Sequence, residues 1–175
     1  MCGIIGIVGK VPVAERLVES LKRLEYRGYD SAGVAGVVEG GVQRRRAKGK
    51  IKALEEVLAA DPLTATTGIG HTRWATHGAP NVANAHPHSA GRVTLVHNGI
   101  IENFAELKAA LAAAGRVFES DTDTEVIAHL IDAELATGLA PVDAFKATLD
   151  RLTGAYALAV LIEGAENLVL GARRG

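Results

Sequence analysis

The chain has a single cysteine, Cys2, which directly follows Met1 and precedes the apolar run 3–8. A free thiol has a pKa of about 8.5, so it needs a nearby base or positive charge to attack near neutral pH. Removal of Met1 would free the α-amino group of Cys2, and such groups have a pKa of about 7.7–8.0. The position therefore predicts an N-terminal nucleophile that carries its own base. The alternative is a small buried side chain at the start of a strand.

A polar stretch, 67–101, is rich in glycine, proline, asparagine and histidine. Two expected strands, 67–72 and 93–97, flank its loop, and the second leads into Asn98 and Gly99, a common tight-turn pair. Loops of this composition often bind ligands, so we expect a binding site here. A simple hairpin turn is a further interpretation of Asn98 and Gly99.

Histidines gather in the same stretch, and three of them could in principle bind zinc. The spacing argues against this, because the chain has no His-Glu-x-x-His pattern and no cysteine pair. We therefore expect no metal. The histidines are His71, His77, His86, His88 and His97.

The composition favours one domain with a substantial core, as 175 residues suffice to bury one. The 19 basic and 20 acidic residues leave a net charge of −1, which favours neither nucleic acid nor an anionic membrane as a partner. A lone cysteine and the absence of a signal-like or membrane-length apolar run predict a cytoplasmic protein.

Helices and strands alternate along the chain, which predicts an α/β or layered α+β domain. The clearest helix is 12–28, where apolar residues recur every three or four positions between a proline and a glycine. Another, 122–138, has Thr122 and Glu125 at the spacing of a capping box. The other expected helices are 51–60, 103–115 and 141–152, and the expected strands are 3–8, 33–38, 42–47, 67–72, 93–97, 154–162 and 167–173.

The chain also contains, in order, the motifs "MCGIIGIVG", "RLEYRGYDSAG", "HTRWATHG", "NAHPH", "VHNGIIEN" and "SDTDTEVIAHL". Together they resemble the glutaminase domain of the glutamine–fructose-6-phosphate aminotransferases, which are type 2 glutamine amidotransferases with an N-terminal nucleophile. The resemblance runs from Cys2 to the last residues. It implies an α+β fold, a four-layer αββα sandwich of the N-terminal-nucleophile hydrolase type.

The resemblance also implies catalytic roles. Cys2 would attack the side-chain amide of L-glutamine, releasing ammonia and leaving a thioester that water hydrolyses. Asn98 and the backbone N–H of Gly99 would form the oxyanion hole. Arg27 would help to stabilise the thiolate, although a solvated charge at a helix C-terminus is an alternative for it. No cofactor is implied.

The substrate-binding residues implied by the resemblance come from two segments. Arg73 would bind the α-carboxylate of glutamine through its planar guanidinium. Asp123 would receive the α-ammonium group, although an aspartate near a helix start is also common for dipole reasons. Trp74, which sits in a polar loop, would be a lid residue. Thr76 and His77 would complete the pocket.

In this family the ammonia passes to a sugar-isomerase domain that converts fructose 6-phosphate to glucosamine 6-phosphate, and the full enzyme is expected to be a homo-oligomer. We expect residues 2–175 to form the glutaminase domain, incomplete at its C-terminus, with the isomerase domain absent. A non-catalytic regulatory or binding module with the same fold is the alternative.

Overall fold

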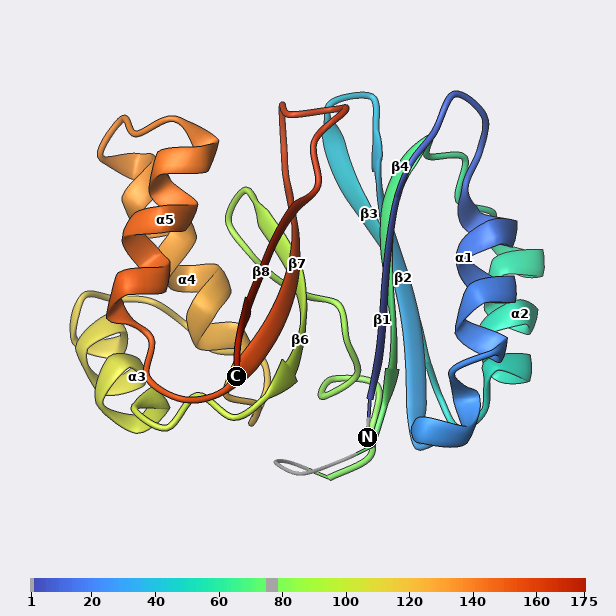
Figure 1. Cartoon of the computed structure of the whole chain (residues 1–175), viewed down its shortest axis with the longest axis horizontal. Coiled ribbons are helices and arrows are strands. Elements are labelled where there is room, and N and C mark those ends of the chain that lie inside the picture. Colours follow the sequence, from blue (N-terminus) through green and yellow to red (C-terminus); the bar gives the residue numbers. More distant parts are fainter. Residues whose placement is uncertain (1, 75–78) are drawn as a thin grey trace.

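Two antiparallel sheets form the centre of the structure, a computed structural model that describes residues 2–74 and 79–175 (Figure 1). The strands are β1 (Gly3–Val8), β2 (Ser31–Val38), β3 (Gly41–Lys48), β4 (Thr67–Arg73), β5 (His88–Ala90), β6 (Val93–Gly99), β7 (Tyr156–Ile162) and β8 (Leu170–Arg174). The first sheet has the order β1-β4-β2-β3 and the second has the order β5-β6-β7-β8.

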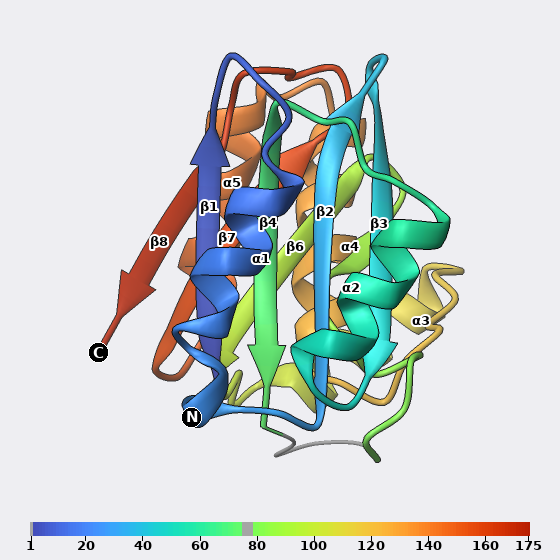
Figure 2. The same ribbon diagram turned by 90° about the vertical axis from the view of Figure 1, so that its right-hand side faces the viewer.

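Helices cover the outer face of each sheet, as Figures 1 and 2 show. The first sheet is covered by α1 (Ala14–Lys22) and α2 (Ile51–Ala60), and the second by α3 (Phe104–Ala113), α4 (Thr124–Ala136) and α5 (Pro141–Arg151). The predicted four-layer αββα sandwich is therefore confirmed. Within the described residues, no helix has both the length and the apolar character needed to cross a bilayer.

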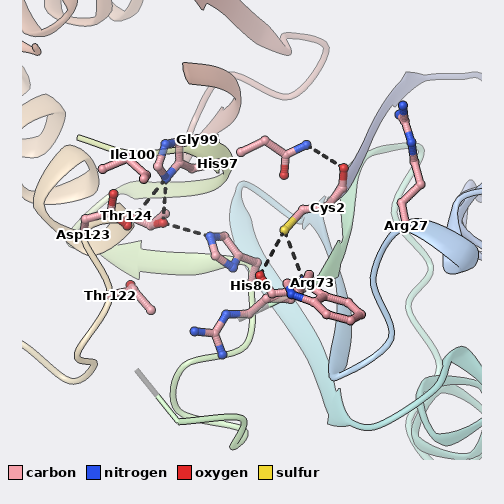
Figure 3. Close-up of a pocket in the computed structure, with 12 residues that line it drawn as sticks. Cys2, Arg27, Arg73, His86, His97, Gly99, Ile100, Thr122, Asp123 and Thr124 are labelled. Atoms are coloured by element: carbon pink, nitrogen blue, oxygen red, sulfur yellow. Dashed lines mark hydrogen bonds and ion pairs between the residues drawn. The ribbon is translucent and has the colours of Figure 1, made fainter. Parts of the chain in front are cut away.

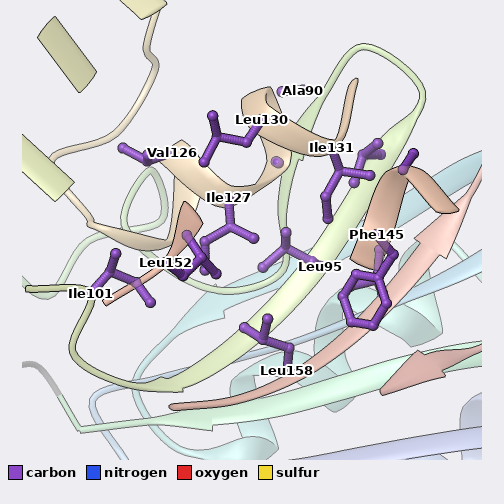
Figure 4. Close-up of a cluster of buried hydrophobic side chains, with 14 of the residues drawn as sticks. Ala90, Leu95, Ile101, Val126, Ile127, Leu130, Ile131, Phe145, Leu152 and Leu158 are labelled. Carbon is purple, nitrogen blue, oxygen red and sulfur yellow. The ribbon is translucent and has the colours of Figure 1, made fainter. Parts of the chain in front are cut away.

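The largest apolar cluster lies between the second sheet and its helices (Figure 4). Ile127 and Ile131 of α4 are fully buried against this sheet, where Leu95 of β6 is also buried. On the other side, Leu17 and Leu21 bury the apolar face of α1 against the first sheet. The helical periodicity in the sequence thus marks the faces that meet the sheets.

A smaller apolar seam joins the inner faces of the two sheets. It contains two alanines, so the side chains between the sheets are not uniformly large. The buried members of the seam are Ala35, Val37, Ile69, Val96, Ala159 and Leu161.

The first helix is shorter than the periodicity predicts. It ends at Lys22 and is followed by a single turn of 3₁₀ helix, η1 (Glu25–Arg27). Leu24, between the two, lies so close to Gly3 that a Cβ on this glycine would be 2.8 Å from the leucine side chain. The apolar repeat therefore continues through Leu24 because this residue is packed, although the chain has left the α-helix.

The hairpin interpretation of Asn98 and Gly99 is wrong. Both residues end β6, where they pair with Ala157 and Tyr156 of β7, and the chain then leads to α3. Gly99 has φ +118°, and a Cβ there would lie 2.1 Å from the carbonyl oxygen of Ala155. The glycine is needed because the backbone has a positive φ here and lies too close to the neighbouring strand to leave room for a side chain.

The short strand β5 was not among the strands predicted from the sequence. It forms a tight hairpin with β6, and Gly91 in the turn has φ +51°. Three residues are too few to show the alternation of apolar and polar positions by which a strand is predicted.

Candidate active site

A cavity of about 500 Å³ opens where the start of β1 and the ends of β4 and β6 meet the start of α4. Its size is typical of a site for a small molecule, roughly 300–1,000 Å³. Thr76 and His77 lie outside the described residues. The other predicted site residues all line this cavity, namely Cys2, Arg27, Arg73, Trp74, Asn98, Gly99 and Asp123.

The Cys2 thiol lies at the cavity wall (Figure 3), and the backbone of Trp74 is next to it. The Trp74 N–H donates a hydrogen bond to Cys2 Sγ, with a distance of 3.1 Å. Burial raises the pKa of the thiol, and the Trp74 N–H and the charge of Arg73 offset this only in part. The thiol is therefore protonated near neutral pH, so a base is needed before it can attack.

The Asn98 side chain connects the two sheets at the cavity. Its Nδ2 donates a hydrogen bond to the carbonyl oxygen of Cys2 at 3.0 Å, and its Oδ1 lies 2.9 Å from Nε2 of His71 on β4. An amide nitrogen carries two hydrogens, so one remains beyond the bond to Cys2. A hydrogen-bond donor is thus held beside Cys2.

Two buried charges of opposite sign line the cavity. Arg73, at the end of β4, is 4% exposed, and its Nη1 lies 3.9 Å from Asp30 and within 3.4 Å of the Ala79 carbonyl oxygen. Asp123, the N-cap residue of α4, accepts a hydrogen bond from the Ile101 N–H at 2.8 Å. A guanidinium and a carboxylate in one small cavity suit a ligand that carries both an anionic and a cationic group.

Trp74 and Arg27 lie at the exposed side of the site. Trp74 is 47% exposed and makes an edge-on contact with the Tyr29 ring, with 5.3 Å between centroids, so it is not a core residue. Arg27 lines the cavity, but its side chain points away from Cys2 (Figure 3). Its role near the thiolate stays a prediction.

Several buried histidines lie beside the cavity, and the sequence alone did not assign them a role in the site. His86 Nε2 and His97 Nδ1 both lie 2.9 Å from the Thr124 hydroxyl oxygen, and the His86 ring stacks on His71 at 4.1 Å. Burial lowers the pKa of His71 to about 3, so its ring is neutral near pH 7. Among residues 2–74 and 79–175, no group of side chains is arranged to bind a metal ion.

The predicted capping box at α4 is wrong. Asp123, not Thr122, is the N-cap residue, and no side chain caps the helix there. Glu125 instead accepts hydrogen bonds from the Glu119 N–H at 2.8 Å, and from the Ser120 N–H and hydroxyl at 2.7 Å and 2.6 Å. The carboxylate thus fixes the segment that leads to Asp123.

Glu125 should make stability depend on pH in the acidic range. Burial raises its pKa, but the nearby His129 ring, 3.5 Å away, and hydrogen bonds from Ser120 and Glu119 outweigh this and lower the pKa to about 2. Because an unfolded glutamate has a pKa of about 4.3, the stabilisation is complete above that pH and is lost as the pH falls toward 2. Glu125→Gln should lower the free energy of unfolding at pH 7 by about 2 kcal/mol and flatten its fall between pH 5 and 3.

Chemical denaturation of both proteins across this range tests the prediction. Glu134→Gln is the matched control, since Glu134 lies on the same helix but forms a more exposed pair with Arg151 at 3.2 Å. Glu134→Gln should lower the free energy of unfolding by no more than about 1 kcal/mol. Equal pH dependence in the wild type and Glu125→Gln would contradict the assignment.

Comparisons with known proteins agree with this geometry. Residues 71–174 match the family described as "Glutamine amidotransferase domain". The whole chain is 85% identical to 29% of the length of the glutamine–fructose-6-phosphate aminotransferase [isomerizing] of Caulobacter vibrioides. Hence the chain spans less than a third of the length of the curated relatives it matches.

Solved structures give the same result. The glutamine phosphoribosylpyrophosphate amidotransferase of B. subtilis is 29% identical with a TM-score of 0.78, and the match covers 93% of this chain and 35% of that one. A structure described as the allosteric regulatory enzyme of purine biosynthesis is 28% identical with a TM-score of 0.80, covering 93% of this chain and 36% of that one. The chain therefore belongs to the glutamine amidotransferase domain family.

Proposed function

We propose that the chain hydrolyses L-glutamine to glutamate and ammonia through a thioester at Cys2. One observation carries this proposal: a thiol, an amide donor, a buried guanidinium and a buried carboxylate line a single cavity. They belong to Cys2, Asn98, Arg73 and Asp123. This set matches the needs of amide hydrolysis on a free amino acid.

In the proposed reaction, Met1 has been removed and the α-amine of Cys2 takes the thiol proton. The sulfur attacks the side-chain carbonyl carbon of glutamine, and the oxyanion accepts hydrogen bonds from Asn98 Nδ2 and the Gly99 N–H. The α-ammonium group of Cys2 then protonates the leaving nitrogen, the C–N bond breaks and ammonia departs. Water, deprotonated by the same amine, cleaves the thioester to give glutamate and the free thiol.

Substrate selection would use the two charged side chains. The Arg73 guanidinium would bind both oxygens of the α-carboxylate, and Asp123 would accept from the α-ammonium. Trp74 would cover bound glutamine as a lid residue, while Thr76 and His77 would complete the pocket.

The fate of the ammonia is also part of the proposal. We propose that residues 2–175 act as the glutaminase domain of a longer, oligomeric, cytoplasmic enzyme, in which a sugar-isomerase domain uses the ammonia to make glucosamine 6-phosphate from fructose 6-phosphate. The names of the longer relatives support this assignment.

The proposal is tested by measuring the release of glutamate and ammonia from L-glutamine. The intact mass of the chain is measured in parallel. We expect hydrolysis by the form that lacks Met1, and no glucosamine 6-phosphate when fructose 6-phosphate is added. A correctly processed, folded chain that does not hydrolyse glutamine would instead support a non-catalytic binding module.

Arg73→Ala should mainly weaken glutamine binding. Loss of a charge-assisted pair costs about 1.5–3 kcal/mol, so KM should rise about tenfold to a hundredfold with a smaller change in kcat. Arg45→Ala is the matched control, because Arg45 pairs with Asp61 at 2.8 Å and does not line the cavity. Steady-state kinetics check this, and a fall in kcat at unchanged KM would refute the carboxylate role.

A further inference from the structure

The two ends of the Asn98 side-chain amide meet groups of opposite hydrogen-bonding character. Nδ2 lies 3.0 Å from the Cys2 carbonyl oxygen, which can only accept. Oδ1 lies 2.9 Å from Nε2 of His71. The orientation of the amide therefore depends on whether this imidazole nitrogen donates or accepts.

The surroundings of His71 decide which nitrogen carries the proton. Nε2 also lies 3.1 Å from the His97 carbonyl oxygen, and a carbonyl oxygen cannot donate. Nε2 must therefore carry the hydrogen, which is shared between the His97 and Asn98 oxygens. Nδ1 of His71 is buried and has no hydrogen-bond partner in the part of the chain that the structure describes.

The plane of the His71 ring is itself held in place. The ring is fully buried and stacks on His86, with 4.1 Å between centroids and 24° between planes. His86 is fixed in turn by the Thr124 hydroxyl at the start of α4. The neutral state of His71 agrees with the low pKa that burial gives it.

We infer that His71 is a positioning residue that orients the Asn98 amide, so that its nitrogen faces the reacting carbonyl and not its oxygen. A flipped amide would set its NH₂ against the His71 N–H and its oxygen against the Cys2 carbonyl oxygen, so both contacts would become repulsive. It would also present an acceptor to the oxyanion. The inference rests on the proposed glutaminase function and extends it to a side chain that does not touch the substrate.

Two substitutions of His71 separate positioning from packing. In His71→Gln the side-chain amide nitrogen can take the place of the imidazole Nε2–H, whereas the shorter side chain of His71→Asn reaches only to the place of Nδ1. His71→Asn should lower kcat by about 100-fold, as expected for losing an oxyanion donor, with KM changed less than about threefold. His71→Gln should restore kcat to within about tenfold of wild type.

His129→Asn is the matched control. His129 is also buried, but it packs against Phe118 with the rings tilted by 55° and lies outside the cavity. Its substitution should lower thermal stability and leave kcat unchanged. An equal loss of kcat in His71→Gln and His71→Asn, or a loss expressed in KM, would overturn the inference.

Nitrogen NMR of the ¹⁵N-labelled chain gives a readout that does not need turnover. We expect His71 to be protonated on Nε2 at neutral pH, and the Asn98 side-chain amide to exchange slowly in the wild type and His71→Gln but rapidly in His71→Asn. A wild-type ring protonated on Nδ1 overturns the inference even if His71→Asn does not fold. If the wild type shows no glutaminase activity, the proposed function fails, while the tautomer and exchange data still decide the role of His71.

Discussion

A chain that keeps Met1 is expected to hydrolyse no glutamine above background, and removal of that one residue should create the activity. Burial raises the pKa of the Cys2 thiol, so the thiol needs a base before it can attack. An α-amine locked in a peptide bond cannot accept the thiol proton. Loss of the attacking group or its base should cost at least about 10⁴-fold in kcat.

The experiment compares three samples of known intact mass: the chain with Met1, the chain after methionine aminopeptidase treatment, and Cys2→Ala treated in the same way. Only the second should release glutamate. Circular dichroism of all three controls for folding. Turnover by the sample that retains Met1 would show that another group activates the thiol, and turnover by Cys2→Ala would exclude Cys2 as the nucleophile.

The second large effect is expected at Asn98. Asn98→Ala should lower kcat by about 100-fold or more while KM changes little, because the donor acts on charge that develops only in the transition state. Asn98→Asp is the sharper variant. Its side chain has the same shape and can still accept from His71, but its carboxylate cannot donate to the oxyanion.

We therefore expect kcat to fall by a similar factor in both Asn98 variants, even though Asn98→Asp preserves the shape of the side chain. Asn103→Ala is the matched control, since this asparagine bonds the Arg151 carbonyl and the Thr153 N–H outside the cavity. It should leave kcat unchanged. Near-normal turnover in Asn98→Asp would remove Asn98 from the oxyanion hole.

Much of the fold can be predicted from local patterns. Apolar residues at helical spacing mark α1 because Leu17 and Leu21 must be buried against a sheet. The limits of such patterns are equally physical. Leu24 keeps the apolar spacing outside the α-helix because its side chain packs closely against Gly3. Glu125 has the spacing of a capping-box residue, but its carboxylate accepts hydrogen bonds from the N–H and hydroxyl of Ser120 instead.

The candidate site also has features that the sequence predicts and features that it does not. Its chemical groups could be predicted, because the motifs around Cys2 and Asn98 resemble those of one family. The role of the histidines could not be predicted from the sequence. The stacking of His71 on His86 brings β4 against the loop before β5, and this contact depends on how the two segments fold together. Spacing along the chain carries no information about such a contact, so these rings could only be considered as zinc ligands.

The seam between the sheets has a consequence for catalysis. Cys2 precedes β1 in the first sheet and Asn98 lies near the end of β6 in the second, so the proposed nucleophile and oxyanion donor come from different sheets. The side chains packed between the sheets, among them Ala35 and Ala159, contribute to the spacing of the two sheets. On the proposed function, this part of the core would act as a spacer, and changes in its side-chain volumes would affect turnover as well as stability.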